Sequence, residues 1–412
     1  MGEHILLINY DFPPNQGIGG RRWGKLAKGL AKQGYIVHVI KSQAIPGNKP
    51  SPWSSDIMHP NIQVTTLPRT YPAVISHTGK SFWDKLHYRF AIWRLKRAVK
   101  GTIYDLSAEW GKPLIAACER LCTDYPIKRI IATGAPWHML YEVGEWNRTR
   151  FNLQYIIDFR DPWLHAKNYG MADLDAARKA FEAHKQERAL ALADVVLSPD
   201  PAILEELKAF AHNRKTSTGR LFVLRHFYDE DDFSQLADAA KSSNDTHKFT
   251  IVYGGDLYQD MQSELRDVVS FFEENSRSNP HVELHIYTDA RVPDFIRDVA
   301  GIRIFPSAGK SFYSIAREAD ALLILLPKHK NHEFTTKFYD YMPLHKPYIV
   351  ASQGGLVADF VVQNQMGYIW KSANQYPWFE NLRSDSFNFQ PKYDISAFSL
   401  TAATKQLTTL FT

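Results

Sequence analysis

The chain has 412 residues, of which 44% are hydrophobic and 23% charged, with a formal net charge of +5. This length exceeds what one hydrophobic core usually holds, so we expect two globular domains. No apolar run is long enough to span a bilayer. The small charge excess could serve anionic nucleotides, phospholipid headgroups or nothing in particular, and we do not expect nucleic acid as a partner.

The first residues of the sequence predict a cytoplasmic location. Glu3 and His4 lead directly into an apolar run of strand length, so we expect no signal peptide. The only cysteines, Cys118 and Cys122, lie one helical turn apart without clustered ligands, so we expect no metal site there.

A βαβ unit is predicted at the start. Ile5–Ile8 reads as a strand, Trp23–Lys32 as a helix and Tyr35–Ile40 as the next strand. The loop before the helix is rich in glycine, and Gly19 and Gly20 would let backbone approach a phosphate closely. Such a loop is also common as a simple turn, and it lacks the dinucleotide-binding GxGxxG pattern.

Residues 80–100 form the most basic stretch. Apolar side chains recur at helical spacing while lysines and arginines occupy another face; the apolar ones are Phe82, Leu86, Phe90 and Trp93. This helix suits the surface of an anionic membrane, but a helix packed on the core with one solvated face is the favoured interpretation.

Further strands and helices alternate along the chain. We expect helices over 103–122, 173–193, 262–274, 311–317, 336–342 and 396–411, strands over 129–132, 222–225, 249–253, 282–287, 302–305, 321–326 and 347–350, and strand, turn and helix over 193–207. The polar stretch 234–248 reads as a linker between a domain at 1–233 and a domain at 249–390. The tail 391–412 is expected to cross back to the first domain.

Two motifs place polar residues just after predicted strands. ATGAPWH (132–138) ends in His138, and YIIDFRDPW (155–163) contains Arg160 and Asp161. Ligands in open α/β sheets bind at the carboxyl ends of strands, so these three side chains are candidate site residues. The alternative is a buried charge network of Asp158, Arg160 and Asp161 that fixes the loop.

A third motif covers 321–350 and reads strand, loop, helix, strand. Thr335 or Thr336 would cap the helix, whose free N–H groups suit an anion. Lys337 and Asp340, three residues apart, would project beside a ligand held there. A plain surface ion pair between these two residues is the alternative.

These motifs resemble retaining GT-B glycosyltransferases of family 4, in particular those that contain DFRDPW. KFYDY followed by HKPYIV resembles the family's nucleotide-sugar site, which implies that Asp340 binds the ribose and that His332 or Glu333 meets the donor sugar. The resemblance also implies backbone contacts to the donor phosphates from Gly19, Gly20 and Thr336. It places Thr335, Gly254 and Gly255 in the donor-binding site, and Arg160, Asp161 and His138 near the reacting centre.

One loop departs from the family pattern. In GGDLYQD (254–260), which contains Gly254 and Gly255, relatives place an Arg or Lys to balance the departing diphosphate, but here no basic residue precedes Arg266. Lys337 or an arginine of the first domain could replace it, because leaving-group stabilisation needs positive charge within contact distance, not at one sequence position.

The resemblance implies an α/β GT-B protein with two Rossmann-like domains whose parallel sheets face an interdomain cleft. The implied reaction is metal-independent transfer of a sugar, with retention, from a nucleotide-diphosphate sugar to a carbohydrate or lipid-linked glycan acceptor. The location would be the cytoplasm, with the inner membrane face as a peripheral site through 80–100. The alternatives are a non-catalytic GT-B subunit and a sugar-nucleotide epimerase.

Overall fold

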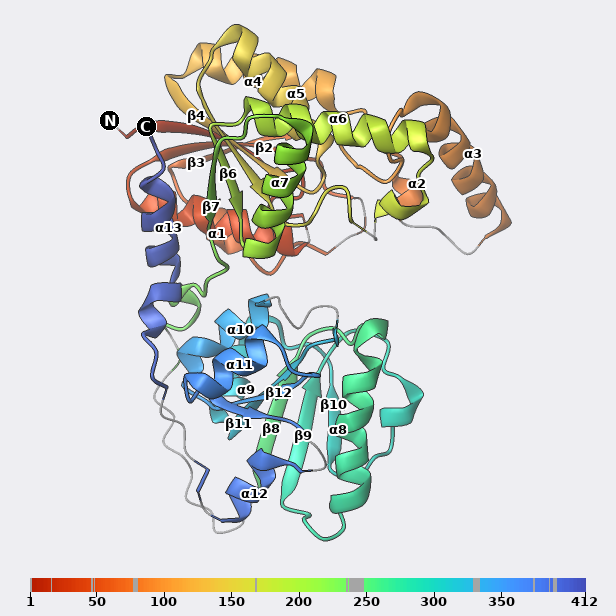
Figure 1. The fold of residues 1–412 in the computed structure, drawn as a ribbon, viewed down its shortest axis with the longest axis vertical. Coiled ribbons are helices and arrows are strands. Elements are labelled where there is room, and N and C mark those ends of the chain that lie inside the picture. Colours follow the sequence, from red (N-terminus) through yellow and green to blue (C-terminus); the bar gives the residue numbers. More distant parts are fainter. Residues whose placement is uncertain are drawn as a thin grey trace. The chain divides into compact units, whose positions relative to one another are not determined.

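A computed structural model of the chain separates into two compact units, shown in Figure 1. The structure describes residues 2–15, 17–45, 47, 49–76, 81–166, 169–234, 236, 248–328, 334–372, 375–384, 386–387 and 391–412. The first unit comprises residues 1–225 and 403–412, and the second comprises 226–402. Most of the predicted linker, including 237–247, lies outside the described residues.

The first unit contains a seven-stranded parallel sheet in the order β3-β2-β1-β4-β5-β6-β7. Its strands are β1 (His4–Ile8), β2 (Ile36–Ser42), β3 (Ile62–Leu67), β4 (Ile127–Gly134), β5 (Gln154–Phe159), β6 (Val195–Ser198) and β7 (Arg220–Val223). The central strands are almost fully buried, as expected for a parallel sheet covered on both faces. Gly134 pairs with Phe159, so the ends of β4 and β5 are level and the loops that follow them meet.

Helices cover both faces of this sheet. The helices of the first unit are α1 (Ile18–Lys32), α2 (Ala73–Ser76), α3 (Phe82–Ala98), α4 (Gly111–Asp124), α5 (His138–Arg150), α6 (Ala176–Leu192) and α7 (Pro201–Arg214), with short turns η1 (Ser54–Ile57) and η3 (Met171–Asp173); α2 and α3 lie beside the sheet. Helices α4 to α7 share one core cluster with the strands, and Figure 1 shows α1 across the sheet from α4 and α5.

The second unit contains a six-stranded parallel sheet in the order β10-β9-β8-β11-β12-β13. Its strands are β8 (Phe249–Gly254), β9 (Val282–Tyr287), β10 (Ile302–Phe305), β11 (Ala321–Leu325), β12 (Tyr348–Ala351) and β13 (Gly367–Ile369). Its helices are α8 (Gln262–Asn275), α9 (Phe312–Glu318), α10 (Thr336–Tyr341), α11 (Leu356–Gln363) and α12 (Pro377–Arg383), and its short turns include η4 (Glu230–Asp232). The predicted pair of Rossmann-like units with parallel sheets is therefore confirmed.

The chain ends on the first unit. After η10 (Ile395–Phe398) comes α13 (Leu400–Thr408), and residues 403–412 belong to the first unit. The Gln154 side chain donates to the Leu410 carbonyl over 2.7 Å, and the Arg129 guanidinium lies 4.3 Å from the centre of the Phe411 ring. The last residues therefore bind near the amino-terminal ends of β4 and β5, whereas His138, Arg160 and Asp161 follow the carboxyl ends of these strands.

Two predicted helix starts are wrong. Helix α1 begins at Ile18 and not at Trp23, because Gly17 takes the N-terminal capping position with φ of 129° and the glycines after it continue as helix. Helix α4 begins at Gly111 and not near residue 103, because Asp105 accepts hydrogen bonds from the backbone and hydroxyl of Ser107 and holds a turn there.

Among the described residues, no helix combines the length and the apolar character required to cross a membrane.

Candidate functional site

The Lys337 side chain lies over the loop that follows β8. A Cβ atom placed on Gly255 would be 2.4 Å from Lys337 Cε and 2.7 Å from Nζ, and Gly255 has φ of 132°. Only glycine fits this backbone conformation and this close approach. The ammonium therefore sits at the carboxyl end of β8, beside the 254–260 loop that itself lacks a basic residue before Arg266.

Aromatic packing fixes the short helix α10 that carries Lys337. Phe338, Tyr339 and Tyr341 are buried, whereas Lys337 and Asp340 are half-buried on the remaining side. The Gly254 N–H donates to the Tyr341 hydroxyl over 3.2 Å, which ties α10 directly to the end of β8. Lys337 and Asp340 thus extend from a rigid support at one edge of the sheet.

The expected threonine cap is present in position only. Thr335 occupies the N-terminal capping position of α10, but its side chain makes no capping hydrogen bond, and Thr336 begins the helix. The Thr335 carbonyl accepts from the Phe338 N–H over 3.1 Å. His332 and Glu333, the candidates for the donor sugar, lie outside the described residues.

In the first unit, Arg160 is held against the loop that follows β4. Its Nε donates to the Gly134 carbonyl over 3.0 Å, and Nη2 donates to the Ala135 carbonyl over 2.6 Å. The guanidinium also fills the space beside Gly19, where an added Cβ would be 1.7 Å from Arg160 Nη1. Gly19 therefore leaves room for Arg160, and Gly20 leaves room for the Asp11 carbonyl, 2.0 Å from its added Cβ.

Asp158, the first acid of the DFRDPW motif, is fully buried beneath α1. Its Oδ2 accepts from Trp23 Nε1 over 2.6 Å and from Arg22 Nε over 3.4 Å. Arg22 also donates to the Leu224 carbonyl over 2.7 Å, so the pair joins β5, α1 and the end of β7. The suggested network of Asp158, Arg160 and Asp161 is therefore wrong: Asp158 pairs with Arg22, Arg160 donates to backbone carbonyls, and Asp161 is exposed.

The exchange of Gly19 for alanine tests the role of this glycine. Gly19→Ala should expel the Arg160 guanidinium from the two carbonyls and cost about 1–3 kcal/mol, the value of a charged hydrogen-bonding group. Urea unfolding measures the loss. In an Arg160→Ala background the same change should cost nothing, because alanine is the better helix former. Additive losses in the double variant would contradict this interpretation.

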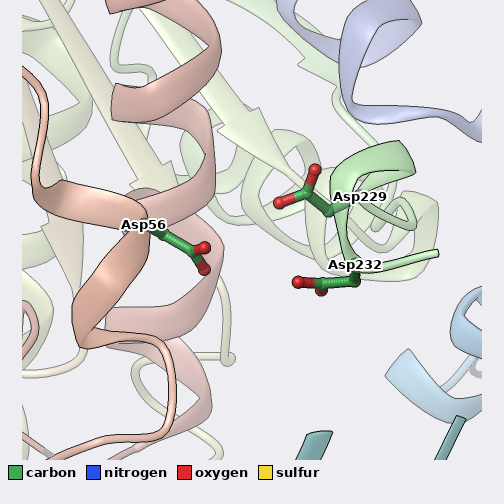
Figure 2. A group of neighbouring side chains, drawn as sticks. All are labelled: Asp56, Asp229 and Asp232. Atoms are coloured by element: carbon green, nitrogen blue, oxygen red, sulfur yellow. The ribbon is translucent and has the colours of Figure 1, made fainter. Parts of the chain in front are cut away.

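Three carboxylates appear in Figure 2, and each has a role within its own unit. Asp56, in η1 of the first unit, lies 3.1 Å from Lys25 Nζ. Asp229 and Asp232 belong to the second unit, where Asp229 caps η4 and Asp232 lies 3.5 Å from Lys310 Nζ. Because cations and a helix cap already use these oxygens, they do not indicate a metal site.

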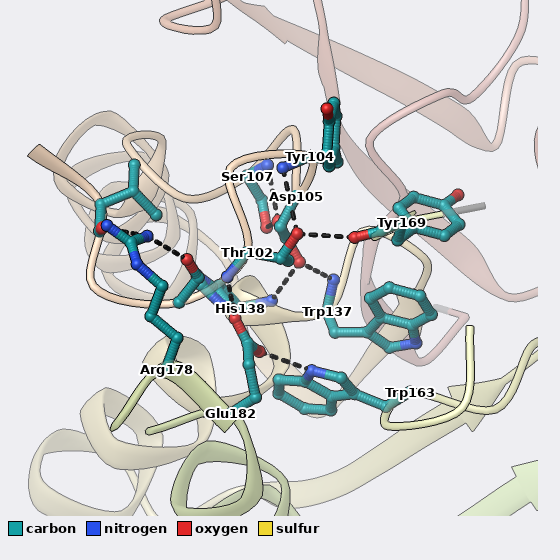
Figure 3. Close-up of polar contacts among 12 residues, drawn as sticks. Thr102, Tyr104, Asp105, Ser107, Trp137, His138, Trp163, Tyr169, Arg178 and Glu182 are labelled. Carbon is teal, nitrogen blue, oxygen red and sulfur yellow. Dashed lines mark hydrogen bonds and ion pairs between the residues drawn. The ribbon is translucent and has the colours of Figure 1, made fainter. Parts of the chain in front are cut away.

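A buried polar cluster connects α5, α6 and the 102–107 turn (Figure 3). His138 Nε2 lies 3.0 Å from Glu182 Oε1, and both side chains are buried. Glu182 also accepts from the Thr102 N–H over 2.5 Å and from Trp163 Nε1 over 2.8 Å. Asp105 accepts from the Trp137 N–H over 2.7 Å, next to the start of α5.

The charges in this cluster determine its protonation. Burial lowers the pKa of His138, but the carboxylates of Asp105 and Glu182 outweigh burial and raise this pKa to about 9. Burial raises the pKa of Glu182, but its hydrogen bond with His138 and the charge of that ring lower it on balance. The pair is therefore an imidazolium and a carboxylate at neutral pH, and His138 points into the protein.

The sequence interpretation found His138 but neither of its carboxylate partners. Glu182 lies in a helix rich in charged residues, so nothing in the local sequence distinguishes it from the exposed acids of that helix. The available signal was position: Glu182, Gln186 and Ala189 share one helical face, and all three are buried. Asp105 was hidden within a region predicted to be helical.

The sequence matches no protein-family model and no curated protein. A glycosyltransferase of Rickettsia africae is similar in structure, with 15% identity, TM-score 0.58, and coverage of 100% of this chain and 98% of its own. HepE of Anabaena, solved with UDP and glucose, has 12% identity, TM-score 0.59, and coverage of 99% and 98%. A Listeria monocytogenes protein assigned as a UDP-N-acetylglucosamine 2-epimerase has 11% identity, TM-score 0.52, and coverage of 99% and 95%. The chain thus has the GT-B fold, with two Rossmann-like units.

Proposed function

We propose that the protein is a retaining glycosyltransferase of the family 4 type. It moves a sugar from a nucleotide-diphosphate sugar to a hydroxyl group of a glycan or lipid-linked glycan. The observation that carries this proposal is the Lys337 ammonium packed over Gly255 at the carboxyl end of β8. The ammonium supplies positive charge beside the 254–260 loop, which contains no lysine or arginine.

The departing nucleoside diphosphate gains negative charge as the sugar leaves. A fixed cation in contact with that charge lowers the barrier without a metal ion, because it is already oriented before the reaction begins. Lys337 takes this role in our proposal. Its position is rigid, since Tyr341 anchors α10 to Gly254 and the Gly255 backbone leaves room for the lysine stem.

Asp340 extends from the half-buried side of α10 that also carries Lys337. A carboxylate accepts two hydrogen bonds at once, which suits the neighbouring hydroxyls of a ribose. In our proposal Asp340 binds the ribose and Lys337 the diphosphate, so one helix reads both parts of the donor. Gly255 leaves room for the Lys337 stem, and Gly254 leaves room for the Phe312 ring.

Three residues of the first unit have different roles in this proposal. Asp161 is exposed and can contact an acceptor hydroxyl. Arg160 donates to the Gly134 and Ala135 carbonyls and so orients the backbone that follows β4. His138 is a positioning residue, because its ring is buried against Glu182 and ties the start of α5 to α6.

A thermal-shift panel of UDP, GDP, CMP, ADP and dTDP tests the donor site. One nucleotide should stabilise the wild type, by about 2.7 kcal/mol at ~100 times its Kd. Asp340→Ala should abolish that shift, whereas Asp267→Ala, an exposed acid on α8 of the same unit, should retain it. Retention of the shift by Asp340→Ala would refute the ribose role, and no shift with any nucleotide would refute the donor site.

A sugar-nucleotide epimerase is the second candidate, since the Listeria protein shares this fold. An epimerase converts its donor without an acceptor, so product analysis of the sugar nucleotide alone separates the two activities. The third reading, a non-catalytic subunit, rested on the missing cation in the 254–260 loop. The place of Lys337 beside that loop argues against it.

A further inference from the structure

Helix α3 exposes a continuous stripe of large apolar side chains. Phe82 is 73% exposed, Leu86 47%, Phe90 62% and Trp93 49%. At 3.6 residues per turn these four positions fall on one face of the helix. The sequence interpretation that favoured core packing of this stripe is therefore wrong.

The opposite side of the same helix attaches α3 to the first unit. Ala91 and Leu95 are buried, and Leu95 packs in a small cluster with Tyr71, Val99 and Ile103. Figure 1 shows α3 at the periphery of the first unit, away from the sheet. The buried side of α3 attaches the helix to the first unit, so the exposed apolar stripe is not needed to hold it there.

The N-terminus of α3 is fixed, which makes the exposed stripe a feature of a formed helix. Ser81 accepts from the Asp84 N–H over 3.0 Å, and Asp84 accepts from the Ser81 N–H over the same distance. This reciprocal capping box uses Asp84, the single acidic residue of the helix.

Basic side chains border the apolar stripe. Lys85, Arg89 and Lys96 are exposed on one side of it. The Arg97 guanidinium lies 4.0 Å from the centre of the Trp93 ring, in line with the stripe. An aromatic stripe edged by lysine and arginine is the pattern of helices that lie in the headgroup region of a bilayer.

We propose that α3 docks the protein on an anionic phospholipid surface. The apolar stripe enters the boundary between headgroups and acyl chains, and the flanking cations bind lipid phosphates. A second copy of this chain is a poorer occupant, because it would bring the same positive border against this one. The proposal goes beyond the transferase reaction and does not depend on it.

Co-sedimentation of the full chain with vesicles tests the docking. We expect binding to vesicles of phosphatidylcholine mixed with phosphatidylglycerol, weak binding to phosphatidylcholine alone, and release at high salt. Phe82→Ser combined with Phe90→Ser should weaken binding at least roughly tenfold, because two deep apolar contacts are lost. Circular dichroism and the melting temperature of this variant should match the wild type, since both side chains are exposed.

A matched control replaces exposed apolar residues elsewhere. Met58→Ser combined with Val362→Ser, 84% and 50% exposed in the parent, should bind vesicles like the wild type. An equal loss in this control, or no binding of the wild type, would overturn the proposal. A dimer in sedimentation velocity that Phe82→Ser and Phe90→Ser abolish, without vesicle binding, would identify a second copy as the occupant and also overturn it. Nucleotide shifts are read separately, so failure of docking leaves the donor site standing.

Discussion

Replacement of Lys337 by methionine should lower kcat by about 10²–10³-fold, the usual effect of removing one fixed charge-stabilising donor. Methionine matches the apolar stem of lysine from Cβ to Cε, so the space over Gly255 stays filled while the ammonium is lost. The measurement is turnover of the donor sugar nucleotide that the thermal-shift panel selects. Because the charge matters most as the diphosphate leaves, KM should change far less than kcat.

The matched control for this experiment is Lys371→Met. Both lysines belong to the second unit and lie over a tyrosine ring, Lys337 at 5.3 Å from Tyr253 and Lys371 at 5.9 Å from Tyr376. Lys371 follows β13 and lies away from the β8 loop, so its loss should leave kcat unchanged. If Lys337→Met keeps full turnover, the cation that balances the diphosphate must be another residue.

Replacement of His138 by leucine should destabilise the first unit by about 3–5 kcal/mol, because Glu182 would remain buried without its cationic partner. Urea unfolding followed by tryptophan fluorescence measures this loss. All tryptophans except Trp370 and Trp378 belong to the first unit, so the signal reports mainly on it.

His165→Leu is the control for this replacement. His165 Nδ1 lies 2.7 Å from Glu206 Oε1, a similar pair to that of His138, but the His165 side chain is 70% exposed. Solvent screens such a pair, so its loss should change the free energy of unfolding by less than about 1 kcal/mol. Equal losses in the two variants would mean that burial does not set the value of the His138 pair.

The free energy of unfolding should depend on pH differently in the wild type and in His138→Leu. The pKa of His138 in the folded protein, about 9, is above the unfolded value, so its stabilisation is complete below the unfolded pKa and is lost as pH rises through about 9. Between these two pH values the free energy of unfolding of the wild type should fall by about 3 kcal/mol, a loss that His138→Leu does not show. Burial raises the pKa of Glu142 to about 7 although the charge of His138 opposes this rise, so in the wild type Glu142 adds a decline below about pH 7, and the loss between about pH 7 and 9 is decisive for His138.

Continuous apolar runs made most of the fold predictable. Ala321–Leu325 and Val282–Tyr287 are strands within one residue of the predicted limits, because a buried parallel strand leaves little room for polar residues. Strand β13 was missed: it has only three residues, all half-buried, and it begins with a glycine. Helix α5 was missed because its first turn coincides with a motif read as a turn.

Local spacing and resemblance made part of the candidate site predictable. Lys337 and Asp340 are neighbours on one helix, so their shared side follows from sequence alone. The approach of Lys337 to Gly255, and of Arg160 to Gly19, joins residues far apart in the chain and depends on how the strands align. Such contacts are set by sheet order and register, which no local pattern records.

The binding of residues 403–412 to the first unit has a consequence for synthesis on the ribosome. Gln154 and Arg129 meet Leu410 and Phe411 only after every residue of the second unit has been translated. Domains generally fold as units in the order in which they emerge. Here the unit that emerges first is completed last, so the nascent chain must carry an unfinished first unit while the second unit is made.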